Sequence, residues 1–327
     1  MSEAVKQAEE LLQRADLRGA ATLLKHAEES GDARAARELA LWCLTGQLIR
    51  RDLAASRALF ERAAELGDAY AAAVARAFIA GGVGGPADWP RAMALLREAA
   101  ANDPDAATQL RLIDAMNLGP NGEPPVEFNS EVLSEEPEVR LFPALFTQTE
   151  CADLIDVATP ALRPSVVIDP HTGRDIPHPI RTSSAAAFSF VDENPAIHAL
   201  NRRLAAASGT DVRAGEPLQV LSYAPGEQYR QHSDALPHVA PNQQRALTFL
   251  VYLNDDYEGG ETAFPALGIQ VRGHTGDGLL FRNASVDGVP DPRAIHAGLP
   301  VTRGAKLLAS RWIRAAPLIL EQAAPAQ

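Results

Sequence analysis

The sequence predicts an α+β protein, in which an N-terminal α-helical solenoid is followed by a double-stranded β-helix, or jelly roll, with supporting helices. Three observations lead to this prediction. Residues of one type recur every 36 positions in the first part of the chain, an acidic stretch with prolines follows, and short apolar runs come after it. We expect a repeat domain at residues 1–116, a linker at 117–139, a second domain at 140–318 and a tail at 319–327.

The repeat is visible at several positions of each unit. Asp16, Asp52 and Asp88 are 36 residues apart, and the same spacing relates Leu23, Leu59 and Leu95, then Ala27, Ala63 and Ala99. Gly31-Asp32 returns as Gly67-Asp68 and approximately as Asn102-Asp103, and Gly46 returns as Gly82. A fixed period of this length is typical of solenoids, whose units bury their apolar faces against one another.

Each repeat unit reads as a pair of helices. AASRALFERAAEL forms the first helix, a Gly-Asp turn follows, and AYAAAVARAFIA forms the second. Small side chains allow close helix approach, and glycines mark helix ends. The pattern resembles Sel1-like repeats, relatives of tetratricopeptide repeats, over about residues 5–115. A plain helical bundle is the alternative interpretation.

The stretch after the repeats has a different character. NLGPNGEPPVEFNSEVLSEEPEV, residues 117–139, contains four prolines and six glutamates. Such a composition is typical of a solvated linker.

Beyond the linker, short strands outnumber helices. TQTECADLIDVAT and PAIHALNRRLAAAS have helical periodicity, whereas LQVLSY, ALTFLVYL, DGLLF and KLLASRWIRA are short and bounded by Gly, Pro or Asp. The short runs read as strands. Many short strands with a few helices favour a β-sandwich or jelly roll.

Composition limits the class of protein. The net charge of -12 argues against nucleic-acid binding, which depends on Lys and Arg. The two cysteines, Cys43 and Cys151, cannot form a disulfide framework or a cysteine-rich zinc site. The N-terminus lacks an apolar signal core, and no stretch approaches the length of a membrane span. We therefore expect a soluble cytoplasmic protein.

His232, Asp234 and His296 form a candidate metal site. In His232-Ser233-Asp234, residues two apart on a strand point to one face, so the imidazole and the carboxylate converge. With His296 they make a two-histidine, one-carboxylate set, which non-heme Fe(II) oxygenases use because it leaves three coordination positions open. Zinc is the competing metal.

Lys306 is the candidate anchor of an acidic co-substrate. It begins the strand KLLASRWIRA, where Ser310 and Trp312 share its face and no acidic residue accompanies it. An interior lysine requires a counter-charge, which a dicarboxylate ligand supplies. Tyr223, on the face of LQVLSY that also carries Gln219 and Leu221, could donate a second hydrogen bond to that ligand.

The segment from about 140 to 316 resembles the catalytic domain of prolyl 4-hydroxylases of the 2-oxoglutarate oxygenase family. The resemblance is carried by EPLQVLSYAPGEQYRQHSD, QRALTFLVYLNDDYEGGETAFP, GDGLLF, IHAGLPVTRGAK and RWI, in this order. It implies Fe(II) on His232, Asp234 and His296, with 2-oxoglutarate held by Lys306 and Tyr223. O2 is then a co-substrate, and ascorbate rescues oxidised iron. It further implies that Thr248, Tyr229 and Trp312 line the active site, Thr248 among the residues that bind the co-substrate.

The resemblance also implies substrate-binding residues. Arg181-Thr182-Ser183 resembles the R-x-S segment that follows a mobile loop over the substrate channel, here VIDPHTGRDIPHPI. Glu216 and Arg245 occupy positions that line the same channel, so Arg181, Ser183, Glu216 and Arg245 are candidates. Arg314 is a departure, since prolyl 4-hydroxylases carry a histidine near the substrate there. This difference weakens the case for a collagen-like substrate.

We therefore expect a 2-oxoglutarate-dependent dioxygenase that hydroxylates a prolyl or other residue of a protein or peptide, with succinate as the second product. The helical repeats are expected to recruit this partner, because stacked helices offer an extended concave surface. No membrane and no nucleic acid are expected as partners. Two alternatives remain open: hydroxylation of a free amino acid or small metabolite, and a repeat scaffold with an inactive oxygenase domain.

Overall fold

The structure, a computed structural model, describes residues 2–168, 175–177 and 180–318. By their internal contacts these residues fall into two compact units. The helical unit contains Met1–Glu123 and Phe190–Ala199, and the sheet unit contains Pro124–Ser189 and Leu200–Leu318. The expected tail at 319–327 lies outside the described residues, as do His171 and His178 of the expected mobile loop.

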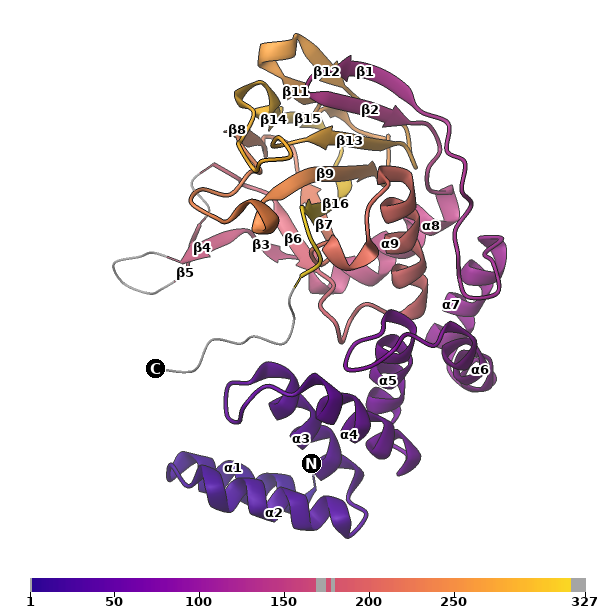
Figure 1. Ribbon diagram of the computed structural model, residues 1–327, viewed down its shortest axis with the longest axis vertical. Helices are drawn as coiled ribbons and strands as arrows, with labels where there is room; N and C mark the ends of the chain where they lie inside the picture. Colours follow the sequence, from indigo (N-terminus) through magenta and orange to yellow (C-terminus); the bar gives the residue numbers. More distant parts are fainter. Residues whose placement is uncertain (1, 169–174, 178–179, 319–327) are drawn as a thin grey trace. The chain divides into compact units, whose positions relative to one another are not determined.

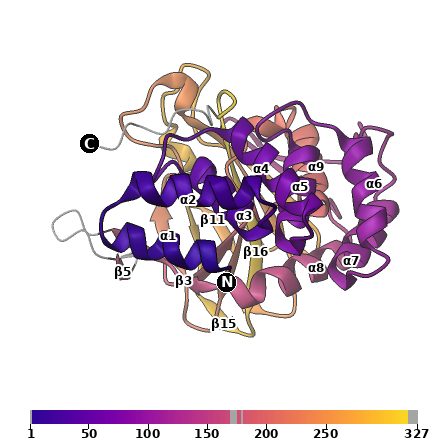
Figure 2. The same cartoon turned by 90° about the horizontal axis from the view of Figure 1, so that it is seen from below.

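The helical unit is a series of antiparallel helix pairs. Its helices are α1 (Glu3–Gln13), α2 (Leu17–Glu29), α3 (Ala33–Thr45), α4 (Leu53–Glu65), α5 (Ala69–Gly81), α6 (Trp89–Ala99) and α7 (Pro104–Ala115). The three repeats correspond to α2 with α3, α4 with α5 and α6 with α7. Sequential helices contact one another, and Figure 2 shows α1 and α2 side by side.

The aspartates that reveal the repeat are helix N-caps. Asp16, Asp52 and Asp88 each accept a hydrogen bond from the backbone N–H three residues later, at the starts of α2, α4 and α6. Asp32, Asp68 and Asp103 cap the second helices in the same way. Each such cap stabilises its helix by about 1 kcal/mol, so the period of the sequence is a period of helix starts.

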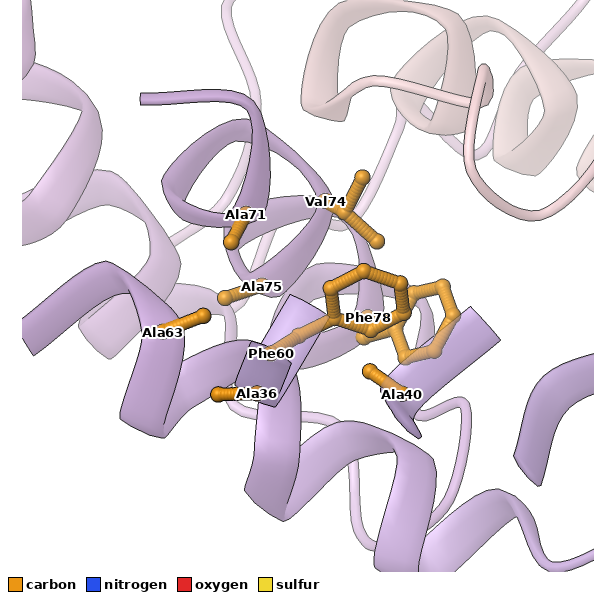
Figure 3. Packing of buried hydrophobic residues seen from close by; sticks show 8 residues of the cluster. All are labelled: Ala36, Ala40, Phe60, Ala63, Ala71, Val74, Ala75 and Phe78. Atoms are coloured by element: carbon orange, nitrogen blue, oxygen red, sulfur yellow. The ribbon is translucent and has the colours of Figure 1, made fainter. Parts of the chain in front are cut away.

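One of the buried clusters in the helical unit is built from alanines around two aromatic rings. Phe60 and Phe78 meet edge to face with ring centroids 5.4 Å apart. Figure 3 shows the alanines and the valine that surround them: Ala36, Ala40, Ala63, Ala71, Val74 and Ala75. Because alanine lets helix backbones approach closely, the two rings are enough to fill the space between α3, α4 and α5.

The sheet unit begins with a hairpin and contains two further helices. These helices are α8 (Gln148–Ala158) and α9 (Pro195–Ser208), of which α9 belongs to this unit from Leu200 onward. Its first strands are β1 (Glu131–Glu135), β2 (Glu138–Phe142), β3 (Arg163–Pro164), β4 (Val166–Ile168), β5 (Asp175–Pro177), β6 (Ser184–Ala187), β7 (Gln219–Tyr223) and β8 (Tyr229–His232). The later strands are β9 (Arg245–Tyr252), β10 (Glu258–Gly259), β11 (Thr262–Phe264), β12 (Ile269–Val271), β13 (Gly278–Arg282), β14 (His296–Gly298), β15 (Val301–Arg303) and β16 (Lys306–Arg314).

Two antiparallel sheets enclose the core of this unit, as in a jelly roll. The larger has the order β1-β2-β13-β9-β16-β7-β6-β3 and the smaller the order β12-β11-β14-β8. Figure 1 shows β13, β9, β16 and β7 in succession. Apolar side chains from both sheets form one buried cluster: Val139, Leu250, Tyr252, Phe264, Val271, Leu279, Phe281 and Leu308.

The expected elements of this half are confirmed where they were predicted. Both helices form, and the four apolar runs become β7, β9, β13 and β16. The stretch read as a linker differs, because its last residues form β1 and the start of β2. Val139 accounts for the difference, because it is fully buried in the core. Its burial stabilises the pairing of β2 with β13, which holds the acidic hairpin at the edge of the larger sheet. Among the described residues no helix combines the length and apolarity needed to cross a membrane.

Candidate metal centre

His232 and His296 are brought together by strand pairing. In the antiparallel pair of β8 and β14 they occupy directly opposed positions. Opposed residues of such a pair have Cβ atoms only about 5 Å apart. Their ring centroids lie 4.3 Å from each other, although the two histidines are far apart in the chain.

Asp234 completes the cluster from outside the strand. β8 ends at His232, so the expected convergence on one face of a strand does not describe Asp234. The chain instead turns after His232 and returns the carboxylate. His232 Nε2 lies 3.6 Å from Asp234 Oδ1, and His296 Nε2 lies 3.6 Å from Asp234 Oδ2. Within the described residues these three form the group whose ligand atoms could hold a metal, all within 4.8 Å of one another.

The backbone orients both imidazoles. His232 Nδ1 lies 2.7 Å from the carbonyl of Arg230, and His296 Nδ1 lies 3.1 Å from the carbonyl of Ala294. A carbonyl oxygen can only accept a hydrogen bond, so each Nδ1 donates its N–H and each Nε2 carries the lone pair. Both lone pairs therefore face the Asp234 carboxylate, as ligand histidines require.

The ionisation of the cluster suits a cation. Burial opposes charge on Asp234, but His296, His232 and the Thr248 hydroxyl together hold its pKa well below the usual range. Burial lowers the pKa of His296 to about 4, against the opposing effect of Asp234. At neutral pH the site thus presents a carboxylate beside a neutral imidazole at His296.

Lys306 is buried at the start of β16 and is 2% exposed. Its Nζ donates a hydrogen bond to the carbonyl of Gly260 at 2.6 Å. Among the residues that the structure describes, no carboxylate forms an ion pair with it. Burial lowers its pKa to about 8, partly offset by Glu261. A cation in this position is favourable only when an anion joins it.

Tyr223 is the direct cross-strand neighbour of Lys306 in the pair of β7 and β16. It is 5% exposed, and burial raises the pKa of its phenol. The Ser183 hydroxyl is its hydrogen-bond partner. Ser183 is itself fully buried and lies 3.3 Å from the Ser165 hydroxyl. Ser183 was expected to contact substrate, but it lies behind Tyr223 and positions that ring.

A cavity joins these groups, with the histidines and Asp234 at one part of its wall and Lys306 at another. Ser310 and Trp312 line it from the same face of β16 as Lys306, as expected. The other lining residues are Arg181, Leu221, Tyr223, Tyr229, Leu250, Thr262, Gly298 and Leu308.

Thr248 has a different place from the one expected. It is fully buried and is not among the described residues that line the cavity. Its hydroxyl donates to Asp234 Oδ2 at 2.7 Å, and Asn283 Nδ2 donates to that hydroxyl at 2.8 Å. Thr248 therefore orients the Asp234 carboxylate and does not contact the cavity itself.

Glu216 and Arg245 form an ion-pair network at the edge of the cavity. Two parallel hydrogen bonds of 2.8 Å join them, and Arg314 also donates to Glu216. The Arg245 guanidinium lies 3.7 Å above the Trp312 ring, which lines the cavity. Neither residue is among the described residues that line the metal cavity, and Arg245 packs on Trp312, which does line it.

Arg181 and Tyr229 lie together beside the metal-binding group. A backbone bridge joins the two residues, and the Arg181 guanidinium lies 5.5 Å from the centre of the Tyr229 ring. Tyr229 stacks on the His232 ring with centroids 3.4 Å apart. Both residues line the cavity.

Three supporting groups were not identified in the sequence. Asn283 acts through Thr248, the Gly260 carbonyl accepts from Lys306, and Thr262 lines the cavity while accepting from the Tyr252 hydroxyl. The role of Gly260 is a tertiary property: the glycine has φ +69°, and its carbonyl approaches Lys306 from 46 residues away in the chain.

Comparisons with known proteins give a consistent result. The profile of the 2OG-Fe(II) oxygenase superfamily matches residues 218–314. Prolyl 4-hydroxylase 1 of Arabidopsis thaliana is 36% identical over 201 residues, which is 56% of this chain and 71% of that protein. Probable prolyl 4-hydroxylase 3 of the same plant is 34% identical over 206 residues, with 56% and 71% covered.

Two solved structures resemble parts of the chain. One is the viral collagen prolyl hydroxylase vCPH from Paramecium Bursaria Chlorella virus-1 in complex with 2OG, with 27% identity and a TM-score of 0.45 over 54% of this chain and 96% of that one. The other is a Sel1 repeat protein from Oxalobacter formigenes, with 24% identity and a TM-score of 0.30 over 33% of this chain and 85% of that one.

Proposed function

Since the chain belongs to the prolyl 4-hydroxylase family of 2OG-Fe(II) oxygenases, we propose that it hydroxylates a prolyl residue of a protein or peptide. The chain is a 2-oxoglutarate-dependent dioxygenase, which uses Fe(II), 2-oxoglutarate and O2, with ascorbate to keep the iron ferrous. The proposal concerns the substrate and the residues that carry out each role.

One observation supports the metal assignment most strongly. Both imidazoles are tied through Nδ1 to backbone carbonyls, so both Nε2 atoms face the Asp234 carboxylate across 3.6 Å. Two imidazole nitrogens and one carboxylate oxygen suit ferrous iron and leave part of its coordination sphere open. We therefore assign His232, Asp234 and His296 as the ligands, with Thr248 orienting Asp234.

Bound iron supplies the oxidising power that couples decarboxylation of 2-oxoglutarate to hydroxylation of the substrate. The remaining roles belong to the protein. Lys306 pairs with the distal carboxylate of 2-oxoglutarate, and Tyr223 lies opposite it as a hydrogen-bond donor. Leu221, Leu250 and Leu308 exclude water from the cavity between them. Holding the keto acid in one pose is itself a large part of the catalysis.

The substrate side of the cavity carries Arg181, Tyr229 and Trp312. Arg245 stacks on Trp312 and is neutralised by Glu216, so this wall offers an aromatic surface and few unpaired charges. A prolyl ring packs well on such a surface. The helical unit is proposed to recruit the protein or peptide that contains this residue.

The proposal is tested by measuring succinate. The purified chain is incubated with Fe(II), ascorbate, O2 and labelled 2-oxoglutarate, with and without proline-containing peptides. We expect slow succinate release without peptide, faster release with a substrate peptide, and a mass gain of one oxygen on proline. His232→Ala and Asp234→Ala should abolish release.

His274→Ala is the matched control, because His274 is an exposed histidine on the same unit. It should leave turnover unchanged. Full turnover in both ligand variants would remove the metal assignment. Oxygen gained only by free amino acids or small metabolites would replace the peptide proposal.

A further inference from the structure

The helical unit contains a groove that the oxygenase chemistry does not use. Its volume is about 500 Å³, and it is lined by α4, α5 and α6, which belong to consecutive repeats (Figure 1). This size falls within the range of ligand-binding sites. Most of its lining is apolar and small: Ala64, Ala72, Ala75, Ile79, Leu95 and Ala99.

Arg76, on α5, is a buried charge within this lining. It is 6% exposed. Eight residues after the N-cap of α5, it occupies the position that Ala40 has in α3, counted from the N-cap Asp32. Ala40 is fully buried in the core of the unit. The third repeat also has an arginine there, since Arg111 lies eight residues after the N-cap Asp103, but Arg111 is exposed. Arg76 is therefore distinguished by its burial, which carries a stability cost.

The contacts of Arg76 do not compensate for its burial. Its Nη2 lies 3.7 Å from Asp103 Oδ2, beyond hydrogen-bond distance. Asp103 Oδ1 already accepts two backbone N–H groups as the cap of α7. The Nε of Arg76 is buried and has no hydrogen-bond partner among the described residues. Because arginine keeps its charge even when buried, this guanidinium favours an incoming carboxylate.

The rim of the groove carries the opposite charge. Glu61 is neutralised by Arg57 at 3.0 Å and by Arg91 at 2.6 Å. Glu65 and Glu98 remain exposed on either side. These carboxylates repel a ligand with many negative charges and attract basic side chains. A ligand with a single carboxylate among apolar and basic residues matches both the buried Arg76 and the glutamates at the rim.

We propose that this groove binds a peptide segment that inserts one glutamate side chain toward Arg76, flanked by small apolar and basic residues. Glutamate supplies the carboxylate on a short apolar stem, which suits a lining that combines Arg76 with alanines, Ile79 and Leu95. The inference rests on the proposed recruiting role of the helical unit, and it gives that role a site and a ligand chemistry.

A peptide array tests the proposal with the full chain. Short peptides of randomised Ala, Leu and Lys around a central Glu are paired with peptides that carry Gln at that position. We expect a subset of Glu peptides to bind about tenfold or more tightly than their Gln partners, the size of effect of a charge-assisted hydrogen bond. Glu and Gln peptides that bind equally, or peptides that do not bind at all, would overturn the proposal.

Two variants identify the groove as the binding site. Ala72→Glu places a carboxylate one helical turn before Arg76, where it pairs with the guanidinium and competes with the peptide. We expect this variant to lose the preference for Glu and to keep or raise its melting temperature. Ala72→Gln is the matched control and should retain the preference. Equal binding by the two variants would contradict the assignment of the site.

Arg76→Leu removes the guanidinium, and Arg97→Leu removes an exposed arginine of α6 that is not part of the groove. Only the first should abolish the preference for Glu, with helicity measured to confirm folding. Succinate release without peptide should be unchanged in all these variants. Peptide binding by a chain without turnover would contradict the enzymatic proposal alone, and turnover without discrimination of Glu would contradict the groove alone.

Discussion

Each unit of this protein has a buried cation in the wall of a cavity or groove, Lys306 in one and Arg76 in the other, and the two differ in their surroundings. Lys306 starts a strand in the interior of a jelly roll and donates to a backbone carbonyl at 2.6 Å. Arg76 stands on a helix in an open groove, with its nearest carboxylate oxygen at 3.7 Å. Burial lowers the pKa of Lys306 to about 8, whereas arginine stays charged throughout the accessible pH range.

The energetic cost of burying a positive charge is met differently by a lysine and by an arginine. A buried lysine can release its proton, so the affinity of its site for an anionic ligand depends on pH. A buried arginine cannot, so its groove remains positive and its energetic cost persists until a carboxylate arrives. Substitutions in each unit should therefore change different properties of the protein.

Lys306→Met should weaken 2-oxoglutarate binding by about 2–5 kcal/mol, because a buried charge-assisted pair is lost. The variant should be as stable as the parent or more so, since an apolar side chain of similar length replaces a buried charge. Calorimetric titration of the Mn(II)-loaded protein measures the affinity. Lys25→Met, at an exposed site of the helical unit, is the control. Unchanged affinity in Lys306→Met would remove this lysine from the co-substrate site.

Thr248→Val should weaken metal binding by about 10- to 100-fold, the usual effect of losing a group that orients a ligand. The substitution removes the hydrogen bond to Asp234 and leaves Asn283 without its acceptor. Competition with a fluorescent chelator measures the metal affinity. Peptide binding by the helical unit should not change. A threonine that lines the cavity instead would affect 2-oxoglutarate more than the metal.

The affinity for 2-oxoglutarate should fall as the pH rises through about 8. Lys306 is protonated below its pKa and neutral above it, and the dianion binds the protonated form. Each further pH unit should then cost about tenfold in affinity. Lys306→Arg serves as the comparison, because arginine keeps its charge and should remove the slope. A slope that persists in that variant would have to come from another group.

Asp52→Ala should destabilise the helical unit by about 1 kcal/mol through loss of the cap of α4. Thermal unfolding followed by circular dichroism measures this change. Binding of 2-oxoglutarate should be unaffected, since no residue of the cavity depends on this helix. Asp52→Asn, which retains a capping side chain, should recover most of the loss.

Much of the helical unit could be predicted from the sequence, because its structure is set locally. A capping aspartate acts on the backbone three residues away, and Gly46 and Gly82 end their helices through their own left-handed conformation. The main strands of the second unit were also predictable from apolar runs. Arg76 was missed because a charged residue in an alanine-rich helix looks solvated until its burial is known.

For the candidate site, the sequence predicted the residue types but not their arrangement in space. Residue type and order were sufficient to single out His232, Asp234, His296 and Lys306, since few side chains can hold iron or a dicarboxylate. The sequence did not show that the two histidines are opposed across β8 and β14, or that Tyr223 opposes Lys306. Register in a sheet is a long-range property, and it also placed Thr248 behind Asp234.

The amino-acid sequence by itself therefore determined the helices, the main strands and the chemical identity of the proposed ligands. The tertiary structure alone decided which side chains face the cavity, that Glu216 pairs with Arg245, and that the acidic hairpin joins the larger sheet. The physical reason is distance along the chain. Caps and turns act within one helical turn, whereas strand register and burial depend on residues that only folding brings together.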